Sequence, residues 1–252
     1  MRTFFILLSK ELRSFFLSPV AWVVLAMFMA ISGFSFSWAV DHLREKPMEQ
    51  SVVQWTFVPP WFWVYYPFVF ALITMRLFAE EQKQGTLESL LTAPVRAVQV
   101  LLAKYFSAVI FYLILWLPVL AFFGVLNWVM KGKVEFPPGA LAGCYLILLL
   151  TGLFHIALGM LASALTKNQI IAAILGFALI ILHFLIGVFL QTQARDHPKE
   201  LRNLVDHVAI KGHIDSFSAG LLDTRPMVYY LSFTVLLLAA THQVLEYRRW
   251  KA

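Results

Sequence analysis

The chain has 252 residues, of which 60% are hydrophobic and only 13% are charged. Soluble domains carry about a quarter charged residues, so this composition excludes an ordinary soluble domain and indicates a membrane protein. The net charge of +6 does not indicate nucleic-acid binding, because the basic residues are dispersed over loop ends and form no continuous stripe. The single cysteine, Cys144, excludes an internal disulfide and is expected to be a small packing residue.

Residues 1–18 form the first predicted element, an amphipathic helix that lies along the membrane surface. Its apolar residues recur at helical spacing: Phe4, Phe5, Leu8, Leu12, Phe15 and Phe16. Lys10, Glu11 and Arg13 interrupt this apolar patch, and the apolar run after Pro19 is too long for a signal peptide. We therefore expect a retained anchor rather than a cleaved leader.

Six charge-poor windows follow, each about 19 residues or longer and so able to cross the hydrocarbon core as a helix. They are Pro19–Val40, Phe57–Met75, Tyr105–Met130, Phe136–Thr166, Asn168–Ala194 and Pro226–Leu245. An aromatic belt is expected near the outer end of the second window, from Trp55, Trp61, Trp63, Tyr65 and Tyr66. The sequence predicts an all-α polytopic membrane protein with six transmembrane helices, in one transmembrane domain over residues 1–252.

Lysines and arginines indicate the orientation. The short segments on one side are dense in cations, whereas the other side has many of its cations in one longer loop that also holds acidic residues. We therefore expect both termini in the cytoplasm, with residues 79–97 on the cytoplasmic side and residues 191–225 outside. A short amphipathic helix is expected in the outer loop, with the apolar residues Leu201, Leu204, Val205, Val208 and Ala209.

The polar segment 79–97 has the signals of a short, terminated helix. Gly85 is expected to break the helix that extends from the second span, and Thr86 to cap a new helix with Glu88 in its first turn. An apolar side is provided by Leu87, Leu90 and Leu91. Pro94 discourages continuation. The segment is either a docking helix or a solvated turn, and its length beyond a bare connection favours docking.

Glutamates and histidines of the sequence raise two alternatives, an intramembrane hydrolase and a metal site. Glu80 and Glu81 resemble the E-E-x-x-x-R pair of intramembrane proteases of the CAAX type, but Gly85 stands in place of the arginine. His155 and His183 lie within predicted spans without the spacing of that family. In the outer loop, a metal could be considered at His207 and His213 with Asp206 and Asp215. The histidine spacing suits neither a helix face nor a tight turn, so no metal site is expected.

The stretch E-E-x-x-x-G-T-L-E-x-L-L-T-A-P from Glu80 to Pro94, followed by Lys104, resembles the cytoplasmic segment between helices two and three of ABC-2 type permeases. In that family the segment forms a coupling helix that fits a groove on the ATPase subunit. The resemblance implies coupling roles for Glu80, Glu81, Gly85, Thr86, Leu87, Glu88, Leu91 and Pro94.

A second stretch runs from His213 into the last window and resembles the gliding-motility branch of these permeases. The residues that carry this motif are His213, Phe217, Gly220 and Asp223, and the last span ends in a basic tail. Thr224-Arg225-Pro226 departs from the family, which often has further polar residues there, and leaves the start of the sixth helix open.

Together these features imply an ABC-2 (type V) exporter-like membrane subunit of a bacterial inner membrane. The sequence has no G-x-x-x-x-G-K-[ST] phosphate loop, so two copies of a separate ATPase are expected to bind ATP and magnesium, with no cofactor in this chain. The other expected partners are membrane lipids and a second permease, either the same chain or a paralogue with a periplasmic domain, but no nucleic acid. The predicted spans lack paired charges, which argues against a proton-driven carrier. An intramembrane hydrolase and a non-transporting scaffold remain the alternatives, and the substrate stays unidentified.

Overall fold

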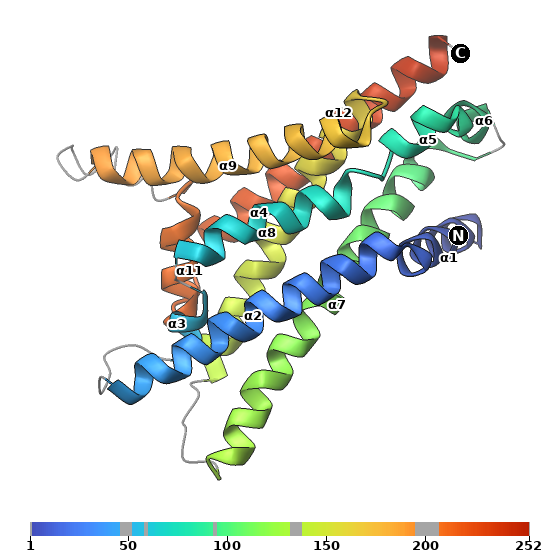
Figure 1. Cartoon of the computed structure of the whole chain (residues 1–252). Coiled ribbons are helices and arrows are strands. Elements are labelled where there is room, and N and C mark those ends of the chain that lie inside the picture. The colour runs from blue at the N-terminus through green and yellow to red at the C-terminus, as the bar shows by residue number, and fades with distance from the viewer. Residues whose placement is uncertain are drawn as a thin grey trace.

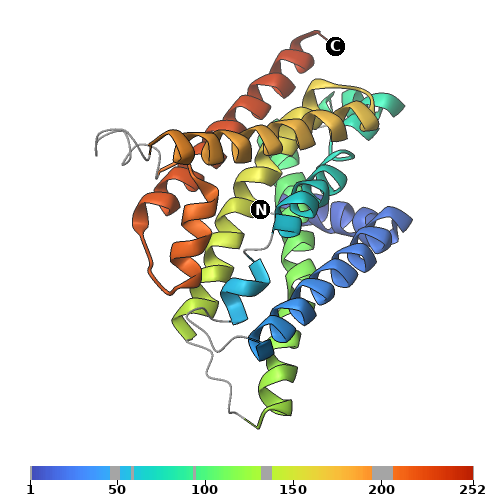
Figure 2. The ribbon, with the colours of Figure 1, turned by 60° about the vertical axis from the view of Figure 1, so that its left-hand side comes forward.

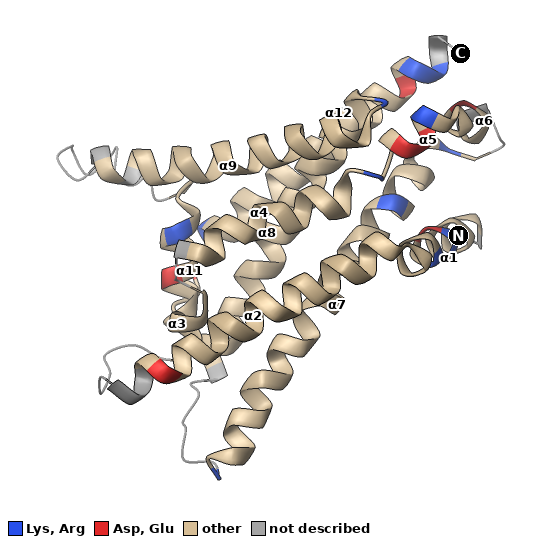
Figure 3. Ribbon diagram, viewed as in Figure 1, with Lys and Arg blue, Asp and Glu red and all other residues tan. Residues whose placement is uncertain are grey.

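The computed structural model describes residues 2–45, 52–57, 60–92, 95–131, 138–194 and 207–251. All regular secondary structure in these residues is helical (Figure 1). Within this part of the chain, six helices are long and apolar enough to cross a membrane, which confirms the predicted all-α, six-span architecture of a multi-pass membrane protein. Figure 3 shows that the middle of the bundle is nearly bare of charged residues, which gather toward its ends.

The spans follow the apolar windows because a helix satisfies all of its backbone groups without water. They are α2 (Pro19–Glu45), α4 (Pro60–Thr74) continued by the short α5 (Ala79–Gln84), α7 (Ala97–Val129), α8 (Pro138–Leu165), α9 (Gln169–Ala194) and α12 (Thr224–Lys251). α7 begins at Ala97 rather than at Tyr105, because the charge of Lys104 is buried and paired inside the helix bundle. α12 begins at Thr224 and accommodates Pro226 in its first turn, where a missing N–H leaves no helical bond unmade.

The N-terminal helix α1 (Arg2–Leu17) confirms the predicted amphipathic element. It turns away from the line of α2 at Ser18 (Figure 2). Its inner side packs on α7, with the ring of Phe15 stacked on Phe111 at 5.3 Å between centroids. Its outer side leaves Phe5 and Leu17 exposed, as expected for a helix that lies along a bilayer surface.

α8 lies at the centre of the bundle and contacts α4, α7, α9, α11 (Ile210–Ser218) and α12. Small residues on α8 permit this close packing. A Cβ at Gly152 would clash with the ring of Tyr112, and a Cβ at Gly159 would clash with Thr74. Glycine at these two positions therefore permits contacts between helices of the same chain.

The end of the bundle opposite α5 carries α3 (Val52–Phe57) and α11, and there two expectations change (Figure 1). Val208 and Ala209 are predicted to be helical, but they lie before a helix that begins at Ile210. The other predicted residues, Leu201, Leu204 and Val205, lie outside the described residues. The apolar spacing that forms α11 is Ile210, Ile214 and Phe217, all buried against the bundle.

The predicted aromatic belt is also partly wrong. Trp63, Tyr65 and Tyr66 are buried. The Tyr66 hydroxyl lies 2.8 Å from the Thr151 hydroxyl of α8, which satisfies its polar group inside the bundle. Trp61 remains half-buried, and its indole N–H donates to Ser35 of α2 at 2.9 Å. These side chains therefore join spans to one another instead of forming a surface belt.

Candidate functional site

The site begins where the second span breaks. α4 ends at Thr74 and α5 begins at Ala79, whereas the sequence predicts an uninterrupted helix. Ser163 of α8 stabilises the break. Its hydroxyl oxygen accepts the backbone N–H groups of Phe78 and Ala79, each at 3.1 Å, and its O–H donates to the Met75 carbonyl at 3.1 Å. The turn is therefore tied to α8 through backbone groups that a continuous helix would have used internally.

The second break lies at Gly85, as predicted. Gly85 has φ +71°, a left-handed conformation that favours glycine, and it separates α5 from α6 (Thr86–Thr92). The predicted capping role of Thr86 is wrong. Thr86 is the first residue of α6, and its hydroxyl donates back to the Glu81 carbonyl at 3.4 Å, across the break.

The remaining residues of the predicted coupling motif differ in placement. Leu87 is buried, whereas Glu88 in the first turn of α6 is exposed. Leu91 belongs to α6 by its backbone, but its side chain and all of Pro94 lie outside the described residues.

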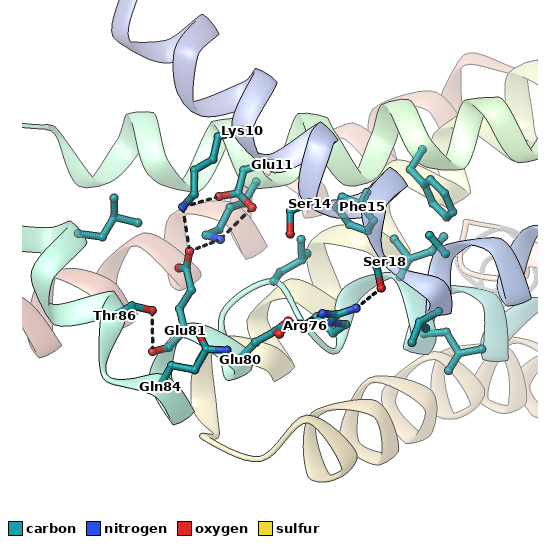
Figure 4. Close-up of a pocket in the computed structure, with 18 of the residues that line it drawn as sticks. Lys10, Glu11, Ser14, Phe15, Ser18, Arg76, Glu80, Glu81, Gln84 and Thr86 are labelled. Carbon is teal, nitrogen blue, oxygen red and sulfur yellow. Dashed lines mark hydrogen bonds and ion pairs between the residues drawn. The ribbon is translucent and has the colours of Figure 1, made fainter.

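α6 separates two hollows. The first, which we call the amphipathic cavity, has a volume of about 520 Å³ and lies among α1, α2, α4, α5, α6 and α7 (Figure 4). Thr86, Ser89 and Leu90 are its α6 wall. The second, which we call the end hollow, has a volume of about 620 Å³ and takes Leu87 and Glu88 as its α6 wall. The opposite walls of the end hollow are Leu165, Lys167, Gln243, Val244, Tyr247 and Arg248. One short helix thus faces both spaces.

Beside the amphipathic cavity, a buried charge cluster joins α1, α5 and α7. The ammonium of Lys104 lies 3.0 Å from a carboxylate oxygen of Glu11 and 3.0 Å from one of Glu81, and Lys104 is only 2% exposed. Lys10 lies 3.5 Å from each of the same two carboxylates (Figure 4). A buried charge is costly unless it is paired, so two ammoniums and two carboxylates balance here. The cluster therefore fixes the position of α5 against α1 and α7.

Glu80 points to a different cation. The Arg76 guanidinium donates to its two carboxylate oxygens at 2.7 and 3.0 Å and also to the hydroxyl of Ser18, at the junction of α1 and α2. Such a bidentate pair holds both partners in one orientation. The adjacent glutamates thus connect the segment to separate parts of the chain, Glu80 to the α1–α2 junction and Glu81 to α7.

The two membrane histidines do not approach this glutamate pair. His155 and His183 bond each other at 3.3 Å, and His183 also bonds the Tyr229 hydroxyl at 3.3 Å. His155 lies eight residues before Ser163 on α8, about 12 Å along the helix from the residue that bonds the turn before α5. These two histidines therefore bond within the bundle and are not joined with Glu80 and Glu81 in one site.

The end of α8 beside the end hollow shows a capping arrangement that the sequence did not reveal. The Ala164 carbonyl accepts hydrogen bonds from the Gln82 amide of α5 and from the Arg248 guanidinium of α12, each at 3.0 Å. These donors satisfy a carbonyl that a helix end leaves without an internal partner. The sequence shows a basic residue, Arg248, late in the last span, but it does not show that its partner is Ala164, 84 positions earlier.

The second sequence motif forms the corner between α11 and α12. His213 is buried and its Nδ1 lies 3.0 Å from the Tyr230 hydroxyl, while Phe217 is fully buried. Gly220 follows with φ +82°, and the Asp223 carboxylate accepts the N–H of Arg225 at 2.9 Å, as an N-cap of α12 does. The structure brings the four motif residues into one corner, and each of them has a structural role there.

This region also contains the residues considered for a metal site, His207 and His213 with Asp206 and Asp215. Within the described residues, no group of three or more His, Cys, Asp or Glu side chains is placed to hold a metal ion, and Asp206 lies outside those residues. Asp215 of α11 is half-buried. Burial raises the pKa of its carboxyl, an effect that the nearby Lys211 ammonium partly opposes.

Comparison with known proteins adds one finding. Residues 13–183 match the model of a family described as ABC-2 family transporter protein, over about two thirds of the chain. This region contains α2 through α8 and most of α9, with both breaks and the α6 walls of the two hollows. It includes Glu81 and Lys104 of the charge cluster, whereas Lys10 and Glu11 precede it. No curated protein matches the chain.

Proposed function

Since the chain belongs to the ABC-2 family of transporter proteins, we propose that a separate ATPase drives it through the α5–α6 segment. Family membership makes the chain a membrane-spanning permease subunit of an ABC exporter. On this proposal, ATP hydrolysis on the partner is coupled to movement of a substrate across or out of the membrane. ATP and magnesium are bound by the ATPase, present in two copies.

The observation that carries the proposal is the way the segment is attached. α6 is bounded by the left-handed Gly85, while α5 behind it is joined to α1 and α7 by Glu81 and to the α1–α2 junction by Glu80. A force on α6 is therefore passed to several spans through short, charge-assisted contacts. Rigid-body displacement of packed helices is an established way to switch between two states.

The motif residues divide between contact and positioning. Glu88 is exposed at the rim of the end hollow, together with Lys167, and we assign these residues to contact with the ATPase. Glu80 and Glu81 act as positioning residues, since their carboxylates face Arg76 and Lys104 within the chain. Leu87 stabilises α6 from the buried side.

The proposal also sets orientation and assembly. The end of the bundle that holds α5, α6 and the ends of α1 and α12 is cytoplasmic, and the membrane is the bacterial inner membrane (Figure 1). A second permease completes the exporter, either the same chain or a paralogue with a periplasmic part. Assignment to the gliding-motility branch rests on His213, Phe217, Gly220 and Asp223, which lie beyond the matched region.

Co-purification tests the proposal. The full chain is isolated from membranes of its own host, and P-loop ATPases in the preparation are identified and quantified. Glu88→Lys and Gly85→Pro are expected to remove the ATPase. Glu246→Lys is the matched control, because it reverses a charge on α12 outside the end hollow.

If folded Glu88→Lys and Gly85→Pro proteins retain the ATPase at the control level, the docking assignment is wrong. Glu80→Gln separates this mechanism from a hydrolase. It is expected to weaken the attachment of α5 to Arg76, whereas loss of a hydrolytic activity with no effect on ATPase recovery or stability would support the enzyme.

A further inference from the structure

The amphipathic cavity has one charged wall and one apolar wall. The charged wall includes Lys10 of α1, Arg76 of the turn before α5 and Glu80 of α5 (Figure 4). Its deeper wall is apolar and is formed by Val20, Ala21, Val24, Leu72, Ile73 and Phe111. Phe111 lies seven residues beyond Lys104, so the apolar part extends about 10 Å along α7 from the charge cluster.

The charges of this cavity are balanced. Its lining contains three cations, Lys10, Arg76 and Lys104, and three carboxylates, from Glu11, Glu80 and Glu81. Lys104 is withdrawn, with 3% of its side chain exposed, whereas Lys10 is 57%, Arg76 29% and Glu80 27% exposed. A ligand in the cavity therefore meets two accessible cations and one accessible carboxylate, with the hydroxyls of Ser14 and Ser89 beside them.

Large apolar side chains near the cavity are exposed, as expected beside a bilayer surface. Leu17 at the end of α1 is 82% exposed, and Trp22 on the first turn of α2 is 58% exposed. The Trp22 indole N–H donates to the Phe16 carbonyl at 2.9 Å, as expected for an amphipathic ring at the interface. With α1 along the bilayer surface, the polar wall of the cavity lies at the depth of lipid head groups and the apolar wall at the depth of acyl chains.

We propose that the amphipathic cavity is a binding site for a zwitterionic phospholipid of the adjoining leaflet. The phosphate accepts hydrogen bonds from Lys10 and Arg76, the ammonium of the head group donates to Glu80, and one acyl chain lies along α2 and α4. The volume of about 520 Å³ falls in the range of small-molecule sites. It accommodates the head group and part of one chain, while the rest of the lipid stays in the bilayer. This site goes beyond the docking of an ATPase and does not depend on it.

Lipid retention by the purified full chain tests the proposal. The protein is delipidated by detergent exchange, and phosphatidylethanolamine, the anionic phosphatidylglycerol or the chain-free glycerophosphoethanolamine is added separately. Bound mass is read by native mass spectrometry and the unfolding midpoint by a thermal melt. We expect one phosphatidylethanolamine per chain and a raised midpoint. The anionic lipid is expected to bind less tightly, and the chain-free head group is expected not to bind.

Two pairs of variants identify the place of binding. Ala21→Phe fills the apolar wall and is expected to lose the lipid; Ala178→Phe adds the same side chain at an exposed position of α9 and is expected to retain it. Lys10→Gln is expected to weaken lipid binding, while Arg13→Gln, exposed on the same helix but outside the cavity, is expected to leave it unchanged.

The second pair keeps the test decisive if Ala21→Phe does not fold. Equal lipid retention by Lys10→Gln and Arg13→Gln would overturn the head-group assignment. Equal binding of glycerophosphoethanolamine and the intact lipid would show a site for a polar solute instead, and tighter binding of phosphatidylglycerol would refute the zwitterion. Recovery of the ATPase is measured on the same variants, so that failure of this site and failure of the docking proposal can be told apart.

Discussion

Replacing Lys104 by methionine removes the central cation of the buried cluster while keeping most of the side-chain volume. Glu11 and Glu81 then share only Lys10, which lies 3.5 Å from each and is largely exposed. The two carboxylates, 10% and 16% exposed, lose the ammonium that lay 3.0 Å from both. We expect the contact of α7 with α1 and α5 to loosen.

The size of this effect can be worked from the burial. Removal of one partner from a buried ion pair costs about 3–5 kcal/mol, because the remaining charge stays desolvated. Lys10 still offers partial compensation, so we expect the lower limit, about 3 kcal/mol of unfolding free energy. For a chain of this size, the unfolding midpoint then falls by about 6–12 °C. Lys83→Met, which changes an exposed lysine of α5, is expected to stay within about 0.5 kcal/mol of the wild type.

The assay is a thermal melt of the detergent-purified chain, performed as a double-mutant cycle. Lys104→Met combined with Glu81→Gln leaves Glu11 with Lys10 and is expected to recover much of the loss. The coupling energy between residues 104 and 81 should be about 1–3 kcal/mol. If Lys104→Met and Lys83→Met have the same unfolding midpoint, the charge cluster does not hold α5 in place. A double-mutant cycle without coupling energy would lead to the same conclusion.

Three further predictions follow from the segment. Gly85→Ala should lower the free energy of unfolding by about 1–2 kcal/mol, since a Cβ is disfavoured at φ +71°. Gly124→Ala in α7 should be neutral or stabilising. A Cβ would meet no other atom at either site, so thermal melts of the two variants isolate the backbone effect. Ser163→Ala should cost about 1–3 kcal/mol in the same melt, because it leaves backbone groups of the buried turn without partners; an unchanged midpoint would contradict this role. Lys167→Glu should reduce ATPase recovery on co-purification, whereas Arg249→Glu, outside the end hollow, should not; equal losses would argue against a specific contact.

Some of this structure could be predicted because it depends on local physics. An apolar window must satisfy its own backbone in a membrane, which explains why the six spans appear near the expected residues. Gly85 is predictable for a similar reason, because a helix break that requires φ above zero favours glycine. These features depend on residues that are close together in the chain.

The features that were wrong or missed depend on distant partners. In the sequence, Lys104 marks the start of an apolar window. It nevertheless lies inside α7, because the carboxylate of Glu11, 93 positions earlier, balances its charge. The turn after Thr74 exists beside Ser163, whose hydroxyl bonds a carbonyl 88 positions away. Thr86 follows the statistical preference for a cap in the sequence but bonds backward to Glu81 in space. Such choices are made by tertiary packing, which local propensity does not contain.

The position of α6 between the two hollows has a thermodynamic consequence. On the proposed assignments, a lipid lies next to Thr86 and Ser89 on one side of α6, and an ATPase contacts the side with Leu87 and Glu88. Both ligands therefore influence the position of the same seven-residue helix. If nucleotide binding changes the preferred placement of α6, lipid affinity changes by some factor. Linkage then requires the lipid to change the affinity for the nucleotide-bound ATPase by that same factor. The composition of the leaflet would act as an effector of the exporter, with no regulatory domain needed.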